Sequence, residues 1–529
     1  MPRPGFVLEV DRSTPPIMFW RGEGFSLEKL PPDRTRVIYP PEPLAGIGDL
    51  DGAIRNALVN PIEMDPLPAL LRPGMKLTIA FDDASLSLPK MRRPDNRQRI
   101  IEAVLDLAAA GGVDDIHIIA ALGLHRRMHE YELRHVLGDR IYDAFHPRGM
   151  LYQHDAEDHD NLTVLGKTDE GEVVEINKRA ADSDLIVYAN VNQVAMDGGW
   201  KSIITGLASY RCLSFHHNPE ALQNTRSLMG HRDHSALHKS IWRMGKVLRE
   251  QGPPIFQIES SINTEAFPSP FDFLRKREWE WNAKDRATYI AATTSLKHMP
   301  NRAKRKMFHS IEAPYATTSV QAGFTPAVHE LTLEHVYRQH LVEVEGQTDI
   351  LTMGIPFISP YNPEGIMNPI LVMCMGLGYL FNMYRNKPLV REGGVVIMTH
   401  PTYREFNPVH HPSYIDFFDE VLADTTDPAV MSTKWERKYA EDEWYRHLYR
   451  TGNAYHGVHP FYAWYWGAHG QQWAGRVIIV GGDPPTVRRL GFTPASTMDD
   501  AFEIATDIVG RSPTISHLHV PGVLVADVQ

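Results

Sequence analysis

The sequence predicts an α/β protein with two α/β domains, largely parallel sheets, and a cleft for cofactor and substrate between the domains. Its 529 residues suffice for several domains at roughly 100–200 residues each. Strand-like and helix-like stretches alternate over residues 76–262 and again in the second half, which is typical of parallel sheets covered by helices. We expect an N-terminal cofactor-binding domain over 1–265, a helical connecting region over 266–345, and a C-terminal α/β domain over 346–529.

The first half begins its alternation with a buried strand at Lys76–Phe81, which ends at two aspartates. Apolar residues at helical spacing predict a helix over Arg99–Ala110, and Gly111-Gly112 is a typical stop signal. Further strands are predicted at Ile116–Ala121, Thr163–Leu165, Val173–Ile176 and Asp184–Asn190. Parallel strands deliver the polar residues at their ends to one edge of the sheet, where ligands of open α/β folds usually bind.

The second half repeats the same signals with fewer elements. Strands are predicted at Asp349–Met353, Gly394–Thr399 and Arg476–Val480, a helix at Met498–Ile508, and a short strand within Pro513–Val520. The sequence shows no internal repeat and no low-complexity segment.

Charge and composition exclude several classes of protein. The chain carries 54 Lys and Arg against 65 Asp and Glu, a net charge of −11, which argues against a nucleic-acid surface. The local basic run Arg302–Lys306 is interpreted as a solvated helix face. Two cysteines are too few for a disulfide framework or a thiolate zinc site, so a metal would rely on imidazole or carboxylate ligands among the 26 histidines. The apolar run Pro369–Phe381 is too short to span a membrane, and the first residues lack a signal-peptide core, so we expect a cytoplasmic protein.

The most informative segment is Asn190–Ser202, which includes Asp197-Gly198-Gly199-Trp200-Lys201. Paired glycines between a strand and a helix let the backbone approach a ligand, and the helix N-terminus favours an anion. Lys201 would then lie beside a bound phosphate or carbonyl group. An ordinary turn with a surface lysine is an equally good interpretation of the spacing. Of His216 and His217, at most one is expected to face the cleft, because adjacent residues of a helix point to different faces.

Several segments in this order resemble the lactate racemase family, whose enzymes use a nickel-pincer nucleotide. Residues 197–217 resemble its Ser-Gly-Gly-Arg-Lys, Pro-Gly-Ile-Ala-Ser and Asn-His pattern. Residues 120–126 resemble its Thr-Gly-x-His-Arg segment, and residues 83–89 its Asp-x-Thr-Arg-Pro-x-Pro segment. Residues 154–158 resemble its His-Asp stretch, and weaker similarity continues at 393–397 and 490–494.

The resemblance implies a role for each matching residue. Lys201 would be joined covalently to the pyridinium ring of the cofactor, and His217 would be the imidazole ligand of nickel. His125 would be the acid/base that removes the hydroxyl proton while a hydride leaves for the cofactor. Further cofactor-binding residues would be Asp83, Ser85, Asp197, Gly198 and Gly199. Since the cofactor brings its own sulfur ligands, few cysteines are needed.

Departures from the family pattern are equally specific. Leu86 stands where the family has an arginine for the substrate carboxylate, and Val191 where it has a second catalytic histidine. The family's second-domain lysine has no counterpart in Gly354–Pro360. A charge-assisted bond is worth about 1.5–3 kcal/mol, so losing two cations should weaken lactate binding about a hundredfold or more. Candidates for the missing acid/base are His216, His400, His410 and His411.

These observations favour a nickel-pincer-nucleotide racemase or epimerase of a hydroxy acid or related hydroxy compound other than lactate. Its partners would be a small hydroxy substrate and the enzymes that make the cofactor, without nucleic acid or membrane; a homo-oligomer is left open. Alternatives are one-sided redox or elimination on the same cofactor, a homologue that binds cofactor without catalysis, and a nicotinamide dehydrogenase suggested only by Val477–Asp483. The aromatic run Phe461–Trp466 is interpreted as a packing cluster, with stacking on a sugar or aryl substrate as its alternative.

Overall fold

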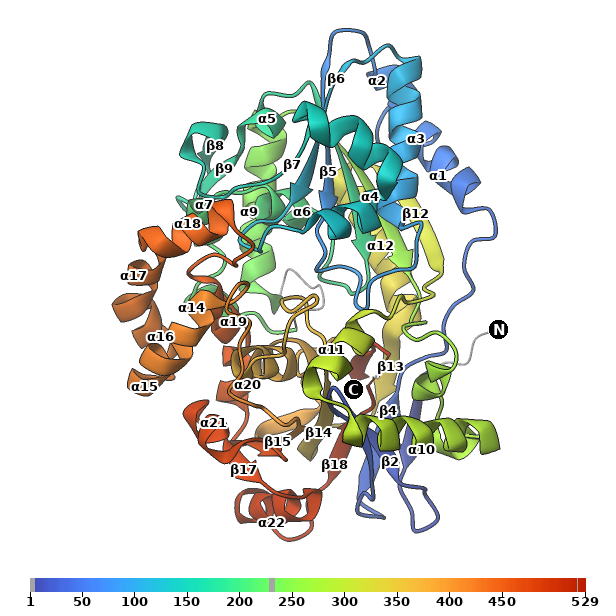
Figure 1. The fold of residues 1–529 in the computed structure, drawn as a ribbon, viewed down its shortest axis with the longest axis vertical. Helices are drawn as coiled ribbons and strands as arrows, with labels where there is room; N and C mark the ends of the chain where they lie inside the picture. Colours follow the sequence, from blue (N-terminus) through green and yellow to red (C-terminus); the bar gives the residue numbers. More distant parts are fainter. Residues whose placement is uncertain (1–4, 228–233, 521) are drawn as a thin grey trace.

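The structure is a computed structural model that describes residues 5–227, 234–520 and 522–529. It contains two α/β units, each built on its own mainly parallel sheet (Figure 1). The predicted fold class is therefore confirmed.

The sheet of the first unit has the strand order β12-β11-β10-β5-β6-β7. All neighbours run parallel except β11 and β12. The strands are β5 (Lys76–Asp82), β6 (Asp115–Ala121), β7 (Leu151–Gln153), β10 (Leu185–Asn192), β11 (Ile255–Ile262) and β12 (Thr317–Gly323). From β5 the chain first builds outward to β6 and β7 and then returns to the other side of β5 for β10. The strand order thus reverses between β5 and β10, which is the place where open α/β sheets bind ligands.

The sheet of the second unit combines both ends of the described chain. Its main path is β1-β4-β18-β14-β15-β16-β17, and β2 pairs with both β14 and β3. The strands are β1 (Phe6–Glu9), β2 (Ile17–Gly22), β3 (Phe25–Glu28), β4 (Thr35–Tyr39), β14 (Thr348–Pro356), β15 (Val390–Thr399), β16 (Arg476–Val480), β17 (Thr493–Ala495) and β18 (Ile515–Leu518). Figure 1 shows the dark blue strands β2 and β4 beside the red strand β18.

Sheet membership departs from the predicted boundaries in two places. Residues 6–39 were expected in the first domain, but their strands complete the second sheet. Strand β12 was expected in the helical connecting region, but it forms the edge of the first sheet. Both departures arise from strand partners that lie far apart in the sequence. Two predicted strands, β8 (Leu162–Lys167) and β9 (Val173–Asn177), form a separate antiparallel pair, and β13 (Leu341–Val344) pairs with β19 (Val525–Val528).

Helices cover both sheets. Those of the first unit are α1 (Leu50–Val59), α2 (Leu67–Leu70), α3 (Asn96–Ala110), α4 (Glu130–Phe145), α5 (Lys178–Ala181), α6 (Lys201–Gly206), α7 (Tyr210–Leu213), α8 (Pro219–Gln223), α9 (Ala236–Gln251) and α12 (Thr325–His340). Helices α10 (Ala283–His298) and α11 (Asn301–His309) contribute Leu296 and Phe308 to an apolar cluster with Trp20 of β2 and Phe25 of β3. Those of the second unit are α13 (Pro369–Met373), α14 (Pro412–Asp416), α15 (Leu422–Asp424), α16 (Pro428–Met431), α17 (Arg437–Ala440), α18 (Glu443–Thr451), α19 (His459–Trp466), α20 (Ala468–Trp473), α21 (Pro484–Arg489) and α22 (Met498–Val509).

Helix α3 shows how local sequence sets these elements. The Asp95 carboxylate accepts the Arg97 amide and caps the first turn, and Gly111 closes the last turn by donating its amide to Leu107. Ile100 and Val104 are buried on one face of the helix. Fully burying such a side chain contributes about 1.5–3 kcal/mol, so the amphipathic pattern fixes which face of α3 meets the sheet.

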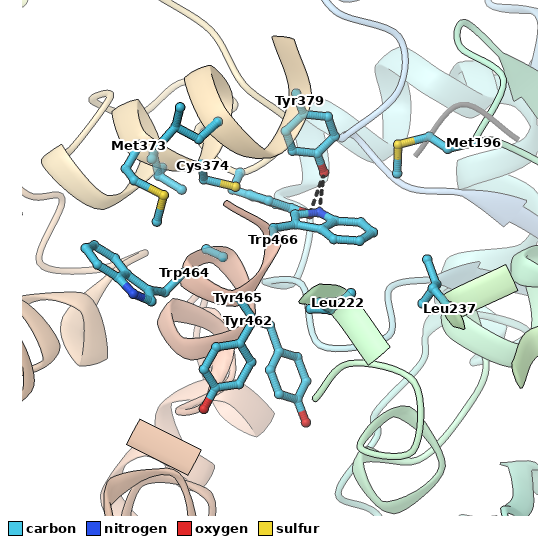
Figure 2. Close-up of a cluster of buried hydrophobic side chains, with 14 of the residues drawn as sticks. Met196, Leu222, Leu237, Met373, Cys374, Tyr379, Tyr462, Trp464, Tyr465 and Trp466 are labelled. Carbon is cyan, nitrogen blue, oxygen red and sulfur yellow. Dashed lines mark hydrogen bonds between the residues drawn. The ribbon is translucent and has the colours of Figure 1, made fainter. Parts of the chain in front are cut away.

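The longest apolar run of the sequence lies inside the second unit. Residues 369–380 form α13 and a following π-helix, and almost all of their side chains are buried (Figure 2). Among the described residues, none belongs to a helix that combines the length and the apolar character needed to cross a bilayer.

Candidate functional site

Two connected cavities lie where the strand order of the first sheet reverses. One, of about 120 Å³, is lined by polar residues at the ends of β5, β6 and β10 and by α19; we call it the polar chamber. The other, of about 220 Å³, is lined mainly by apolar residues of both units; we call it the apolar chamber. The residues that line both chambers are Ser85, Leu86, His125, Asp197, Lys201, Thr205, His217, Tyr361 and Trp466.

The polar chamber contains a histidine held by a buried aspartate. Nδ1 of His125 lies 2.8 Å from Oδ2 of Asp83. Burial raises the pKa of Asp83, but its contacts with His125 and Ser85 outweigh burial and leave that pKa below its ordinary value. Since an ionised carboxylate can only accept a hydrogen bond, Nδ1 of His125 carries a hydrogen and Nε2 is left as the basic nitrogen. Ser85 donates its amide to the other oxygen of Asp83, at 2.9 Å, and so orients the carboxylate.

A second aspartate supports the floor of this chamber. Asp82 lies at the end of β5. Its Oδ2 accepts a hydrogen bond from the Asn190 side chain and another from the Val191 amide, each 2.8 Å long. Burial is the main cause that raises the pKa of Asp82 to about 7, against the lowering effect of the Val191 amide and of Arg97. Asp82 therefore ties β5 to β10 at the edge where the ligand residues begin.

Lys201 is the first residue of α6 and reaches both chambers. Its Nζ donates to the carbonyl of Met196 at 3.1 Å. The turn before it is held by Asp197, whose Oδ2 accepts the amides of Gln193 and Val194 at 3.0 and 2.9 Å. Burial raises the pKa of Asp197, and nearby Lys201 opposes that rise.

The two glycines of this turn have different surroundings. Gly198 lines the polar chamber, whereas Gly199 lines neither chamber. The Gly199 amide donates to the buried Glu259 carboxylate at 2.7 Å, and Glu259 also contacts Nδ1 of His329 at 3.2 Å. A Cβ on Gly199 would lie 2.9 Å from the His329 ring, and its φ of +62° favours glycine. Gly199, predicted to bind cofactor, thus lies behind the wall of the cavity because its amide is committed to Glu259.

His217 faces both chambers, and its neighbour His216 faces neither. Nδ1 of His217 is buried and has no hydrogen-bond partner among the described residues. Burial, with His216 and Lys201 nearby, places the pKa of His217 well below its ordinary value, so the ring is neutral near pH 7. An unprotonated imidazole is the form that binds a metal ion.

Side chains of the second unit close the cavity over these residues. The ring of His125 lies 5.3 Å from that of Tyr361 and 5.5 Å from that of His459, measured between centroids. Tyr462 and Trp466, from the aromatic run, lie 5.4 and 5.9 Å from the His217 ring. Figure 2 shows Trp466 donating from Nε1 to the Tyr379 hydroxyl, a hydrogen bond of 3.0 Å. The run is therefore mostly packing, as expected, and two of its aromatic rings also line the cavity.

His459 is a site residue that the motif analysis missed. It begins α19 and lines the polar chamber, and its Nδ1 lies 2.6 Å from the Tyr414 hydroxyl. Burial is the main cause that places its pKa well below the ordinary value. The only sequence signal for it was its place at the start of the aromatic run.

The four histidines considered for the missing acid/base do not line either chamber. His216 is fully buried, and His400 contacts Thr402. His410 lies beside His129, and His411 contacts the carbonyl of Tyr361. Their positions thus do not fit the role for which they were considered.

The two positions with apolar replacements also have distinct places. Leu86 lies at the junction of the two chambers. Val191 is buried in an apolar cluster that includes Trp20, Phe267 and Phe357, all three of which line the apolar chamber. Val191 therefore stands one layer behind the cavity wall.

A metal site made only of protein ligands is not found in residues 5–227, 234–520 and 522–529: no three His, Cys, Asp or Glu side chains gather there to hold an ion. Two observations nevertheless fit a cofactor that supplies most of its own ligands. Nδ1 of His217 is a buried nitrogen without a partner, and the Lys201 amine projects into the same cavity.

Fold and site together define a two-unit α/β protein whose ligand site lies at the strand-order reversal of one sheet and is closed by the other unit. Residues 22–230 match the family model described as the lactate racemase N-terminal domain. The lactate racemase of Lactiplantibacillus plantarum is 26% identical over 194 residues, and that of Thermoanaerobacterium thermosaccharolyticum is 24% identical over 193 residues. Each match covers 36% of this chain and 43% of the relative, less than half of its length. These matches show that the first part of the chain is similar to the N-terminal domain of lactate racemases.

Solved structures extend the likeness of fold to the second unit. The lactate racemase apoprotein from Thermoanaerobacterium thermosaccharolyticum has a TM-score of 0.63 at 18% identity, covering 97% of this chain and 99% of that one. A crystal structure of a protein from Thermotoga maritima has a TM-score of 0.51 at 15% identity, covering 92% and 100%. At these identities the comparison establishes a shared fold.

Proposed function

We propose that this protein is a racemase or epimerase that uses a nickel-pincer nucleotide and acts on a hydroxy compound other than lactate. The observation that carries the proposal is the convergence of His125, Lys201 and His217 on one cavity. His125 lies in residues 120–126, and Lys201 and His217 lie in residues 197–217; both segments resemble motifs of the family, in the same order. A homologue that only bound the cofactor would need Lys201 and His217 but not His125.

Two residues would hold the cofactor. The Lys201 amine would form the covalent attachment, and His217 would bind nickel through a ring nitrogen that faces the cavity. When bound, the group supplies a reversible acceptor for a hydride from the carbon that carries the hydroxyl group. Asp197 and Gly198 would form the adjacent wall, since both line the polar chamber.

His125 would move the hydroxyl proton. With Nδ1 bonded to Asp83, its Nε2 is free to accept a proton from the substrate as the C–H bond breaks. The imidazolium that forms remains paired with a buried carboxylate, which stabilises its charge. The Tyr361 ring packs against the His125 ring, with 5.3 Å between their centroids, and lines the same cavity.

His459 would be the second proton carrier. Racemisation requires the planar ketone to present its other face, and turning a ketone about the adjacent C–C bond moves its oxygen by about 2 Å for a C=O bond of about 1.23 Å. The ring centroids of His125 and His459 are 5.5 Å apart. A substrate oxygen between the two rings would therefore lie near His125 before the ketone rotates and near His459 after it has rotated. The Tyr414 hydroxyl lies 2.6 Å from Nδ1 of His459 and would hold the orientation of that ring.

The test begins with loading of the cofactor. The protein is made together with the cofactor-forming enzymes, and intact mass and bound nickel are measured for wild type, Lys201→Arg and His217→Ala. We expect a mass adduct and about one nickel in wild type, no adduct in Lys201→Arg, and an adduct with much less nickel in His217→Ala. Lys201→Arg is the matched control because it keeps the positive charge. Wild type without adduct and nickel would refute the proposal.

Loaded protein is then offered single enantiomers of deuterated hydroxy compounds. Racemisation predicts formation of the other enantiomer with retention of the hydroxy compound. Net loss of the hydroxy compound would instead support one-sided redox or elimination on the same cofactor, the alternative favoured by the valine at position 191.

A further inference from the structure

The apolar chamber is much larger than a substrate the size of lactate needs. Its volume of about 220 Å³ exceeds the roughly 150 Å³ of an apolar protein cavity that binds benzene. Its walls include the 84–90 loop, residues 193–197, the segment after β11, the end of β14 and the π-helix after α13. The apolar lining includes Leu88, Met196, Phe267, Phe357, Ile358 and Met383.

The two chambers are lined by more acidic than basic side chains. Three carboxyl groups line them, those of Asp82, Asp83 and Asp197, whereas Lys201 is the only Lys or Arg among the described lining residues. Burial raises the pKa of Asp82 and of Asp197, and the pKa of Asp83 lies below its ordinary value. Under the proposed function, attachment of the cofactor removes the charge of the Lys201 amine. His340, in the apolar chamber, does not supply a cation, because burial lowers its pKa to about 4.

The junction of the chambers adds no charge. Leu86 lines both chambers, so any substrate that reaches from His125 into the apolar chamber passes this side chain. A carboxylate held there would lose its hydration without gaining a cationic partner, which is costly. Away from the residues that it shares with the polar chamber, the apolar chamber is lined by neutral polar side chains such as Gln193, Asn263 and Thr264.

We propose that the substrate is an uncharged hydroxy compound with an aromatic ring or an apolar group of similar size, which occupies the apolar chamber while its hydroxyl group faces His125. This inference rests on the proposed function for the identity of the reacting carbon, but the charge and shape of the chamber are properties of the protein alone. It selects an amide, ester or ketone neighbour for that carbon over a free carboxylate.

The test compares four ligands that separate charge from size. 2-Hydroxy-3-phenylpropanamide, 2-hydroxy-3-phenylpropanoate, lactamide and lactate are titrated by calorimetry into full-length Lys201→Gln protein purified without the cofactor-forming enzymes. The glutamine is uncharged, as the lysine would be after attachment of the cofactor. We expect the phenyl amide to bind at least tenfold more tightly than the phenyl acid and at least tenfold more tightly than lactamide. Equal or tighter binding of the phenyl acid, or no measurable binding of the phenyl amide, would overturn the inference.

Two variants of one residue locate the charge selection. Leu86→Arg places a cation at the junction and should reverse the preference, so that the phenyl acid binds more tightly than the phenyl amide. Leu86→Met, the matched control, keeps an apolar side chain and should retain the wild-type order. Thermal unfolding of both variants verifies that they fold, and an unchanged preference in a folded Leu86→Arg would count against this location of the charge selection.

Failure here is distinguishable from failure of the proposed function. The titrations use no cofactor, so the expected binding order together with absent nickel would refute the function and leave the inference standing. Racemisation of a hydroxy acid by loaded protein, together with tighter binding of the phenyl acid, would support the proposed function and refute the inference about the substrate.

Discussion

Replacing Asp83 by asparagine should remove the basic form of His125 while leaving the fold intact. The Asp83 carboxylate accepts a hydrogen from Nδ1 of His125 across 2.8 Å and is buried. An asparagine side chain is of the same size but can offer its NH₂ group to Nδ1. The ring would then carry its hydrogen on Nε2, the nitrogen that faces the substrate, and would lose its capacity as a base.

The size of the effect follows from that single bond. A hydrogen bond to a charged group is worth about 1.5–3 kcal/mol, which corresponds to a rate loss of roughly 10- to 150-fold if it is fully expressed in the transition state. The racemisation rate is measured by chiral chromatography on loaded protein, and the tautomer of His125 by ¹⁵N NMR of the imidazole. Ser85→Ala is the control, because it removes a contact to Asp83 but keeps the carboxylate. A rate within threefold of wild type, with hydrogen still on Nδ1, would refute the reasoning.

Three further predictions concern the second proton carrier and the packing of the second unit. His459→Phe keeps a ring of similar size and should lower the racemisation rate by about 100-fold or more without changing the adduct mass on Lys201. Tyr414→Phe should lower the racemisation rate by a smaller factor. A His459→Phe variant that racemises as fast as wild type would exclude His459 from proton transfer. Glu278 accepts hydrogen bonds from Tyr39, His519 and the Met18 amide, and these contacts outweigh burial and lower its pKa. The ionised form of Glu278 therefore stabilises the fold at pH values above the unfolded-state pKa, and this stabilisation is lost as the pH falls. Glu278→Gln should reduce the free energy of unfolding in urea by about 1.5–3 kcal/mol at neutral pH and by less near pH 4. An equal reduction at both pH values would contradict this prediction. A Cβ on Gly354 would lie 2.3 Å from the backbone nitrogen of Trp20. Gly354→Ala should therefore destabilise the protein by about 1–3 kcal/mol, measured by thermal unfolding. An unchanged midpoint of thermal unfolding would show that β2 can move away from β14.

The sequence predicted the elements whose signals are local. The apolar runs of β5, β6 and β10 and the amphipathic pattern of α3 correspond to strands and a helix in the structure, within a few residues. The assignment of β4 to the second sheet had no local signal, because its partner β18 lies more than 470 residues further along the chain. Hydrophobic pattern tells that a segment is a strand but not which strand it pairs with.

The residues of the candidate site likewise divide into those with a local sequence signal and those placed by long-range packing. His125, Lys201 and His217 lie in motifs near the ends of strands and helices of one sheet, so sequence order alone brings them to one edge. His459 reaches that edge only because α19 of the other unit packs over it. The apolar chamber likewise combines residues that are widely separated in the sequence, and its shape depends on tertiary packing that no short motif records.

The contribution of β1 to β4 to the second sheet has a topological consequence. The chain passes from the second unit to the first after β4 and returns once, between β12 and β14. Two connecting segments of the backbone therefore join the units. No single cut of the backbone would therefore yield two fragments that each contain a whole sheet.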